Sequence, residues 1–251
     1  MGKESGMGAH LYVNGVHLSD DIRSVAIASP RGVQDVTPIN KSGHARQLLT
    51  RDGSMGLSVF WDPDVAHAEF SALPTTDVPV MYVHLPTVGE PAASMVAKQV
   101  GYDPTRDANG AISEIVVQTL ANGYGLEWGR MLTAGISEIV TAGAGTALDY
   151  GAGVGTTLFG LQAYLHVFAF AGTSATVAIQ HSDDGDPGGA GDAYANVTNG
   201  AFNAASGVGS QRLQTDRDET VKQFLRVNVT GTFSDFHFAV AVTRNLEEVL
   251  F

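Results

Sequence analysis

The stretch RDGSMGLSVFWDPDVAHAEFSAL, Arg51–Leu73, decides the fold, because it predicts a turn, a strand and a short helix in succession. From Ser54 to Trp61 polar and apolar residues alternate with the period of two that a half-buried strand shows. Asp62 and Pro63 then suit the first positions of a helix, which Pro74 would end. The predicted buried faces hold Met55, Leu57, Val59 and Trp61 on the strand and Ala66, Phe70 and Leu73 on the helix.

The rest of the chain predicts strands rather than helices. Thirty glycines and only 16% charged residues indicate many turns, as a protein of numerous short strands requires. The segment HLYVNGVHLS, His10–Ser19, is typical of a hairpin around an Asn-Gly turn. Val221–Thr230 alternates cleanly between apolar and polar residues. We therefore expect a mainly β protein in which one short helix packs on a sheet.

A Gly/Ala-rich stretch, TAGAGTALDYGAGVG at Thr141–Gly155, has the composition of a linker. It separates two blocks that each contain enough alternating segments for a β-sandwich. The sequence thus predicts two domains, residues 1–145 and 146–251.

Two segments of the first block look exposed. Residues 1–9 are small, polar and Gly-rich, which is typical of a mobile arm. Ile39–Leu49 shows little periodicity and predicts a long loop, entered by a short strand at Val33–Thr37. A loop of this length in a compact domain is usually functional or disordered.

Composition excludes several classes of protein. With no cysteine, the chain can form neither disulfides nor thiolate metal sites. No apolar run approaches the roughly 20 residues of a membrane helix, and MGKESGMGAH at the N-terminus lacks the apolar core of a signal peptide. The net charge of −12 is opposite to that of a protein that grips DNA phosphates. Such a charge could let a protein surround DNA without binding it, or could serve solubility alone.

The sequence shows no constellation of residues that indicates catalysis. The loop His181–Asp186 could hold a hard cation such as calcium, but its Asp and Gly residues are also ordinary turn residues, and we favour the turn. His84 and His166 lie in apolar segments, as core histidines do. Asp62 and Asp64 are explained by the start of the helix. We expect no enzyme, no catalytic, cofactor-binding or metal-binding residues, and no cofactor.

Two parts of the chain resemble known proteins. VTPINKSGHARQLLTRDGSMGLSVFWDPDVAHAEF, residues 36–70, resembles major tail tube proteins of long-tailed bacteriophages: a polar loop enters a strand after a glycine turn, and the strand ends in an aromatic-Asp pair and a short helix. LQAYLHVFAFAGTSATVAIQHSDDG (161–185) and TVKQFLRVNVTGTFSDFHFAVAVTRN (220–245) are similar to the sandwich domains that close major tail proteins of some phages of actinobacteria.

The resemblance implies a fold and a function. It implies a tail-tube-like β-sandwich or barrel with one helix, followed by a C-terminal sandwich that decorates the surface. Hexameric rings would stack into a tube that delivers the genome, with ring-to-ring contacts from residues 1–9 and Asn40–Leu49. The protein would be made in the host cytoplasm, reside in the virion without inserting into a membrane, and contact itself, the tape measure, the tail terminator and the distal tail protein, while DNA passes transiently.

A second hypothesis belongs to another class. A β-sandwich acting alone in adhesion could bind carbohydrate by stacking exposed aromatic rings on sugars. Tyr194, Phe202 and Tyr164 are the candidate rings. A flat row of exposed aromatic side chains would favour this hypothesis, and a ring of subunits would favour the tube.

Overall fold

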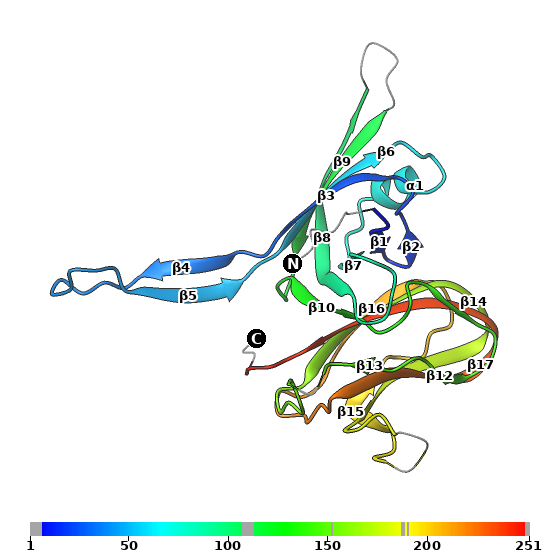
Figure 1. The fold of residues 1–251 in the computed structure, drawn as a ribbon. Coiled ribbons are helices and arrows are strands. Elements are labelled where there is room, and N and C mark those ends of the chain that lie inside the picture. Colours follow the sequence, from blue (N-terminus) through cyan, green and yellow to red (C-terminus); the bar gives the residue numbers. More distant parts are fainter. Residues whose placement is uncertain (1–6, 107–112, 152, 187–188, 190, 249–251) are drawn as a thin grey trace. The chain divides into compact units, whose positions relative to one another are not determined.

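In a computed structural model the regular secondary structure of the described residues is almost all strand, with one short helix (Figure 1), so the mainly β prediction is confirmed. The structure describes residues 7–106, 113–151, 153–186, 189 and 191–248. The chain forms two compact units. The large unit comprises residues 1–20, 79–94 and 127–251, and the arm unit comprises residues 21–78 and 95–126.

The two units do not follow the predicted division at residues 145 and 146. Three segments of the predicted first domain, residues 1–20, 79–94 and 127–145, belong to the same unit as residues 146–251. Which segments fold on their own is a separate question, and there the two-domain division stays a prediction.

The large unit is organised around two very long strands, β14 (Leu161–Ser182) and β17 (Phe224–Arg244). They pair antiparallel from Leu161 opposite Arg244 to Ser182 opposite Phe224. The strand order is β15-β14-β17-β10-β8-β7-β1-β2, and β16 pairs with β14. The remaining strands are β1 (His10–Val13), β2 (Val16–His17), β7 (Val78–Val83), the start of β8 (Pro91–Thr105), β10 (Glu127–Met131), β15 (Ala195–Ala201) and β16 (Gly209–Gln214).

One hydrophobic core fills the large unit. Its members come mainly from β14 and β17, and the fully buried side chains include Leu165, Ile179, Phe236 and Phe238. The pairing of the long strands shifts register near their middle, between Val167 and Ser174. Gly231 lies opposite this region with φ +134, and a Cβ there would lie 2.2 Å from the Ser174 carbonyl oxygen, so only glycine fits.

The Gly/Ala-rich stretch is not a free linker, which corrects the sequence interpretation. It contains β12 (Gly143–Ala144) and β13 (Leu148–Asp149), and both pair with β17, as does the preceding β11 (Ser137–Ile139). Leu148 is buried in the core. Small residues here supply backbone hydrogen bonds to β17 rather than flexibility.

The arm unit contains a sheet of order β3-β6-β9-β8 and a separate two-stranded sheet. In the central strand β6 (Ser54–Phe60), Met55, Leu57 and Val59 are buried, as the alternation predicts. Trp61 was predicted to share their face but is 40% exposed, because the strand ends one residue earlier. The other strands are β3 (Ile22–Ala28), β4 (Arg31–Asp35), β5 (Arg46–Arg51), β9 (Glu114–Ala121) and the end of β8.

The predicted helix exists and is shorter than expected. Helix α1 spans Ala66–Ser71, with Ala66 and Phe70 buried. Asp62 accepts hydrogen bonds from the backbone N–H groups of Asp64 (2.8 Å) and Val65 (3.1 Å), so it caps the turn that leads into the helix. Leu73 is not on the buried stripe: its φ of +46 lies outside the helical region, and the side chain is 55% exposed.

Candidate assembly surface

The most exposed part of the arm unit is the ribbon formed by β4 and β5, which Figure 1 shows as a separate pair of strands. Every residue of both strands is exposed. The two strands of an isolated hairpin contribute little stability of their own in water. We call residues 31–51 the arm.

The arm carries apolar side chains on both strands and at its tip. Leu48 is 59% exposed, Val33 54% and Ile39 fully exposed, and Val36 and Leu49 are also exposed. Contiguous exposed apolar side chains on a soluble protein mark an interaction site or an aggregation liability. The sequence prediction placed Ile39–Leu49 in a loop, but its end, from Arg46 onward, is strand β5.

Hydrogen bonds hold the tip of the arm in one conformation. The Asp35 carboxylate accepts from the backbone N–H of Thr37 at 2.9 Å and pairs with His44 Nδ1 at 2.9 Å. The Thr37 hydroxyl accepts the N–H of Ala45 at 2.8 Å. The hydrogen bonds from Thr37, and to a smaller extent the one from His44, lower the pKa of Asp35. The tip is therefore pre-organised, which lowers the entropic cost of binding.

The arm also differs from the rest of the chain in charge. It has four Lys and Arg residues against one Asp, a net charge of +3 in a chain of net charge −12, so the remaining residues carry −15. The four cations are Arg31, Lys41, Arg46 and Arg51. A positively charged arm is complementary to the acidic remainder of a second copy of the chain.

Strand pairing offers a second surface in the arm unit. β6 is not an edge, because it pairs with β3 on one side and β9 on the other. The outer strand of this sheet is β3, which pairs only with β6 among the described residues, whereas β8 pairs with β7, β9 and β10. Unpaired strand edges are templates for pairing with another chain. The exposed edge of this sheet therefore lies at β3, one strand away from β6.

Sequence reasoning missed a small aromatic cluster near the end of β6. The Trp61 ring stacks on His67 of α1 with 4.4 Å between ring centroids. His67 Nδ1 in turn forms a 2.5 Å hydrogen bond with the Tyr102 hydroxyl. The signal in the sequence was the aromatic residue directly before Asp62, which we assigned to the buried face.

The remaining sequence expectations have mixed outcomes. Residues 1–6 of the predicted N-terminal arm lie outside the described residues, and Met7 is 83% exposed. His166 is fully buried, as predicted, and burial lowers its pKa to about 3. His84 is only half-buried and follows β7 rather than lying within it.

The acidic loop after β14 is engaged in its own hydrogen bonds. Lys222 Nζ lies 2.6 Å from Asp192 and 3.2 Å from Asp183, and Asp184 accepts the backbone N–H groups of Asp186 and Asp192. No group of three or more His, Asp or Glu residues suited to a metal ion occurs in the described part of the chain. The geometry is that of a turn neutralised by a lysine.

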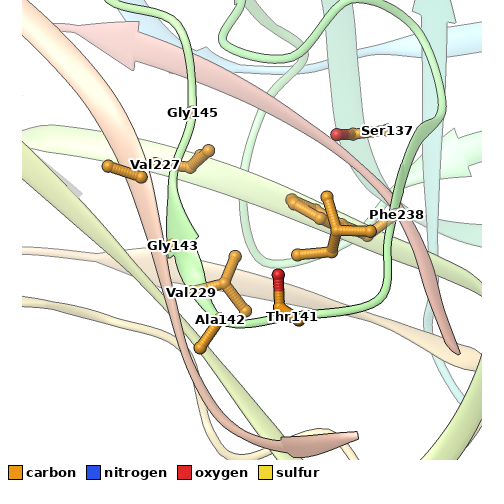
Figure 2. Close-up of a pocket in the computed structure, with 10 residues that line it drawn as sticks. Ser137, Thr141, Ala142, Gly143, Gly145, Val227, Val229 and Phe238 are labelled. Atoms are coloured by element: carbon orange, nitrogen blue, oxygen red, sulfur yellow. The ribbon is translucent and has the colours of Figure 1, made fainter. Parts of the chain in front are cut away.

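A cavity of about 230 Å³ lies between the segment 137–145 and β17 (Figure 2). Ser137 and Thr141 supply the only polar side chains among its lining residues, and the others include Val227, Val229 and Phe238. The lining contains no titratable group that could act as a general acid or base.

The three aromatic rings that the carbohydrate hypothesis needs are buried or covered. Tyr164 is 1% exposed and Phe202 4%, so neither can stack on a sugar. The ring of Tyr194 is covered by Arg226, whose guanidinium carbon lies 3.8 Å from the ring centre. Tyr164 instead donates a 2.7 Å hydrogen bond to Glu127, which forms a buried ion pair with Arg212 at 2.8 Å.

Comparisons with known proteins give distant structural likenesses only. No protein-family model matches the chain, and no curated protein matches it. No helix in the described residues is long and apolar enough to cross a membrane.

The similar solved structures belong to phage tails and related particles. The tail of an empty gene transfer agent particle with C6 symmetry aligns at 15% identity and a TM-score of 0.39, covering 51% of this chain and 98% of that one. The SPP1 Dit protein, described as a hub of the adsorption apparatus, aligns at 14% and 0.34, covering 94% and 98%. The phage p2 baseplate aligns at 10% and 0.33, covering 94% and 98%. Because these TM-scores are low, we base the proposal on the chain's own residues.

Proposed function

We propose that the protein is a structural component of a phage tail, and that its copies join through the arm unit into hexameric rings that stack into the tail tube. The observation that carries the proposal is the arm: a pre-organised ribbon, exposed on every strand residue, apolar and positively charged in an acidic chain. The sequence resemblance of residues 36–70 to tail tube proteins, which overlaps the arm, supports it independently.

The physical account has two parts. Pairing of the outer strand β3 of one copy with a strand of the next copy would cover an exposed sheet edge. Such a contact is heterologous, and it closes into a ring when the rotation between copies allows. The arm, with its charge of +3, would then lie on the acidic surface of a copy in the same or the next ring.

The overall charge suits a conduit for DNA. A wall rich in Lys and Arg would hold the phosphates and slow the exit of the genome. With 14 Lys and Arg against 26 Asp and Glu, and four of those cations placed on the arm, we expect the lumen wall to be acidic or neutral. A virion location and contacts with other tail proteins belong to the same proposal.

The test is electron microscopy of the purified full-length protein together with an arm variant. Wild-type protein should give rings of six subunits, or stacks of them. Leu48→Asp, on the arm at 59% exposure, should abolish the rings. Val208→Asp, at 60% exposure in the large unit, introduces the same charge at an equally exposed site and should leave them intact.

Four outcomes would count against the proposal. A wild-type protein that stays monomeric at all concentrations would contradict assembly. Rings of another subunit number would contradict the hexamer. Rings that survive Leu48→Asp but not Val208→Asp would place the assembly surface in the large unit. Single rings that never stack would contradict the proposed tube but not the proposed ring.

A further inference from the structure

In the large unit, two arginines and one tyrosine form a cluster that has more hydrogen-bond donors than acceptors. Arg130 on β10 and Arg244 at the end of β17 lie with their guanidinium carbons 5.4 Å and 4.5 Å from the centre of the Tyr150 ring. Arg130 is opposite Val242 in the pairing of the two strands. Because residues two apart share a face, Arg130 and Arg244 project on the same side of the sheet.

Arg244 is buried, and it has no acidic partner in the part of the chain that the structure describes. Only 6% of the residue is exposed, and its guanidinium donates to two neutral acceptors, the carbonyl oxygens of Lys222 at 2.9 Å and Val154 at 3.4 Å. Its Nε is buried and has no hydrogen-bond partner among the described residues. Burial of a charge is costly unless an opposite charge pairs with it.

The other two members of the cluster are also unsatisfied within the described residues. The Tyr150 hydroxyl is buried and has no hydrogen-bond partner there. Burial raises the pKa of Tyr150 to about 12, so the group remains an O–H donor at neutral pH. Arg130 is exposed, and no described carboxylate lies within ion-pair distance of it or of Arg244.

Two other arginine–tyrosine contacts in the same unit show what a satisfied pair looks like. Arg212 lies over Tyr164 and forms a 2.8 Å ion pair with Glu127. Arg226 lies over Tyr194 and donates from Nε to Gln180 at 2.9 Å. In both contacts a side-chain acceptor of the chain itself receives the guanidinium hydrogen bonds. The cluster at Tyr150 lacks such an acceptor among the described residues, although acids outnumber bases in the chain, 26 to 14.

We propose that Arg130, Tyr150 and Arg244 form a binding site for an oxyanion, the carboxylate or phosphate group of a ligand from outside the chain. Guanidinium groups match the geometry of both anions and bind them with paired hydrogen bonds. Exposed Arg130 meets the ligand from solvent, and the buried Arg244 and the Tyr150 hydroxyl lie behind it. The site is in the large unit and is independent of the arm, so it goes beyond the proposed role in assembly.

The test is thermal unfolding of the full-length protein at pH 7 with increasing inorganic phosphate or, in a second series, acetate. Sodium chloride is reduced in parallel to keep the ionic strength constant. A ligand that binds only the folded state raises Tm in a saturable way. We expect saturation with phosphate, with a weaker effect of acetate, and an apparent Kd at least about tenfold weaker in Arg130→Gln, which removes an exposed side chain.

Two further variants separate binding from stability. Tyr150→Phe keeps the ring contact with both arginines and removes only the unpartnered hydroxyl, so it should weaken phosphate binding without unfolding the protein. Arg226→Gln removes an arginine that also lies over a tyrosine, and it should leave the phosphate response unchanged.

The results that would overturn the site are specific. No saturable rise in Tm with either anion would do so, as would an equal rise in wild type and Arg130→Gln. Loss of the response in Arg226→Gln alone would assign it to another site. A Tm that follows protein concentration rather than phosphate would mean that the acidic surface of a second copy, and not a free ligand, occupies the arginines.

Discussion

The arm and the β14–β17 pair are both pairs of antiparallel strands, yet their surroundings are opposite. β14 and β17 pair over about twenty residues each, and their inward side chains form the core of the large unit. β4 and β5 are five and six residues long and bury none of their side chains. The same backbone geometry thus forms part of the core in one place and is exposed to solvent in the other.

The difference shows that strand pairing alone does not determine whether a pair of strands stabilises the fold. Hydrogen bonds between strands contribute little net free energy, because water competes for the same groups. Burial of apolar surface decides whether a ribbon stabilises the chain that contains it. By this criterion β14 and β17 stabilise the chain, whereas the apolar side chains of the arm stay exposed.

The largest expected effect lies in the core ribbon. Phe236 is fully buried and stacks on Phe238 with 4.6 Å between ring centroids. Phe236→Ala should lower the free energy of unfolding by about 3–5 kcal/mol, the usual range for a large buried aromatic residue. Denaturant melts measure this. Leu48→Ala on the arm is the matched comparison and should cost less than about 0.5 kcal/mol; similar costs at both positions would break the comparison.

The next effect is a pH dependence that belongs to the large unit. His166 is buried neutral on β14, its Nδ1 accepts the Gly15 N–H at 3.2 Å, and burial lowers its pKa from 6.5 to about 3. The unfolded chain therefore binds the proton first as pH falls below 6.5. Stability should decrease by about 1.4 kcal/mol per pH unit between pH 6.5 and 3, and should be fully present above pH 6.5.

The measurement is the free energy of unfolding at several pH values between 5 and 7. His10 and His17 also have lowered pKa values because of burial, and they act in the same direction. Above pH 5 the acidic residues whose pKa is lowered are almost fully charged in both states and add little. His166→Phe should flatten the profile, and an unchanged slope in this variant would show that His166 is not the group responsible.

A smaller effect is expected at the start of α1. Asp62→Ala removes the acceptor for two backbone N–H groups and should cost about 1 kcal/mol. Phe70→Ala, which empties a buried site in the same unit, should cost about 3–5 kcal/mol. Chemical denaturation of both variants gives the ranking, and the reverse order would mean that the helix is not anchored through Phe70.

The smallest effect on the folding of the isolated chain should come from the charges of the arm. The double variant Arg46→Gln, Arg51→Gln should change the free energy of unfolding by no more than about 0.5 kcal/mol, because these residues are exposed. Assembly should weaken in this variant, and its dependence on salt should become shallower. Light scattering at several salt concentrations measures both. An unchanged salt dependence of assembly would show that the charges of the arm do not contribute to it.

Sequence periodicity predicted what is decided locally. Met55, Leu57 and Val59 are buried because alternation along one strand reflects its immediate surroundings. The prediction failed where a partner far along the chain intervenes. Gly143 and Ala144 look like linker residues, but they pair with Val229 and Asn228, some eighty residues later.

The candidate surface was visible in the sequence only in part. The polar residues around Asn40 predicted an exposed segment, and the structure places it at the tip of the arm. Leu48 lies in the segment that was predicted to be an exposed loop, whereas Val33 was assigned to a short strand, and nothing in the sequence marks Val33 as exposed. The cluster at Tyr150 was also missed, because Arg130 and Arg244 come from strands more than a hundred residues apart.

The bond between Gly15 and His166 has a consequence for synthesis. A ribosome has to make more than 150 further residues before the first hairpin finds its partner, and β17 comes later still. The arm unit is complete at Leu126. Domains generally fold in the order in which they are made, so the arm unit can fold while the large unit is still being translated. The apolar arm is then exposed on a nascent chain, so the contact surface of the proposed assembly would be available before the large unit is finished.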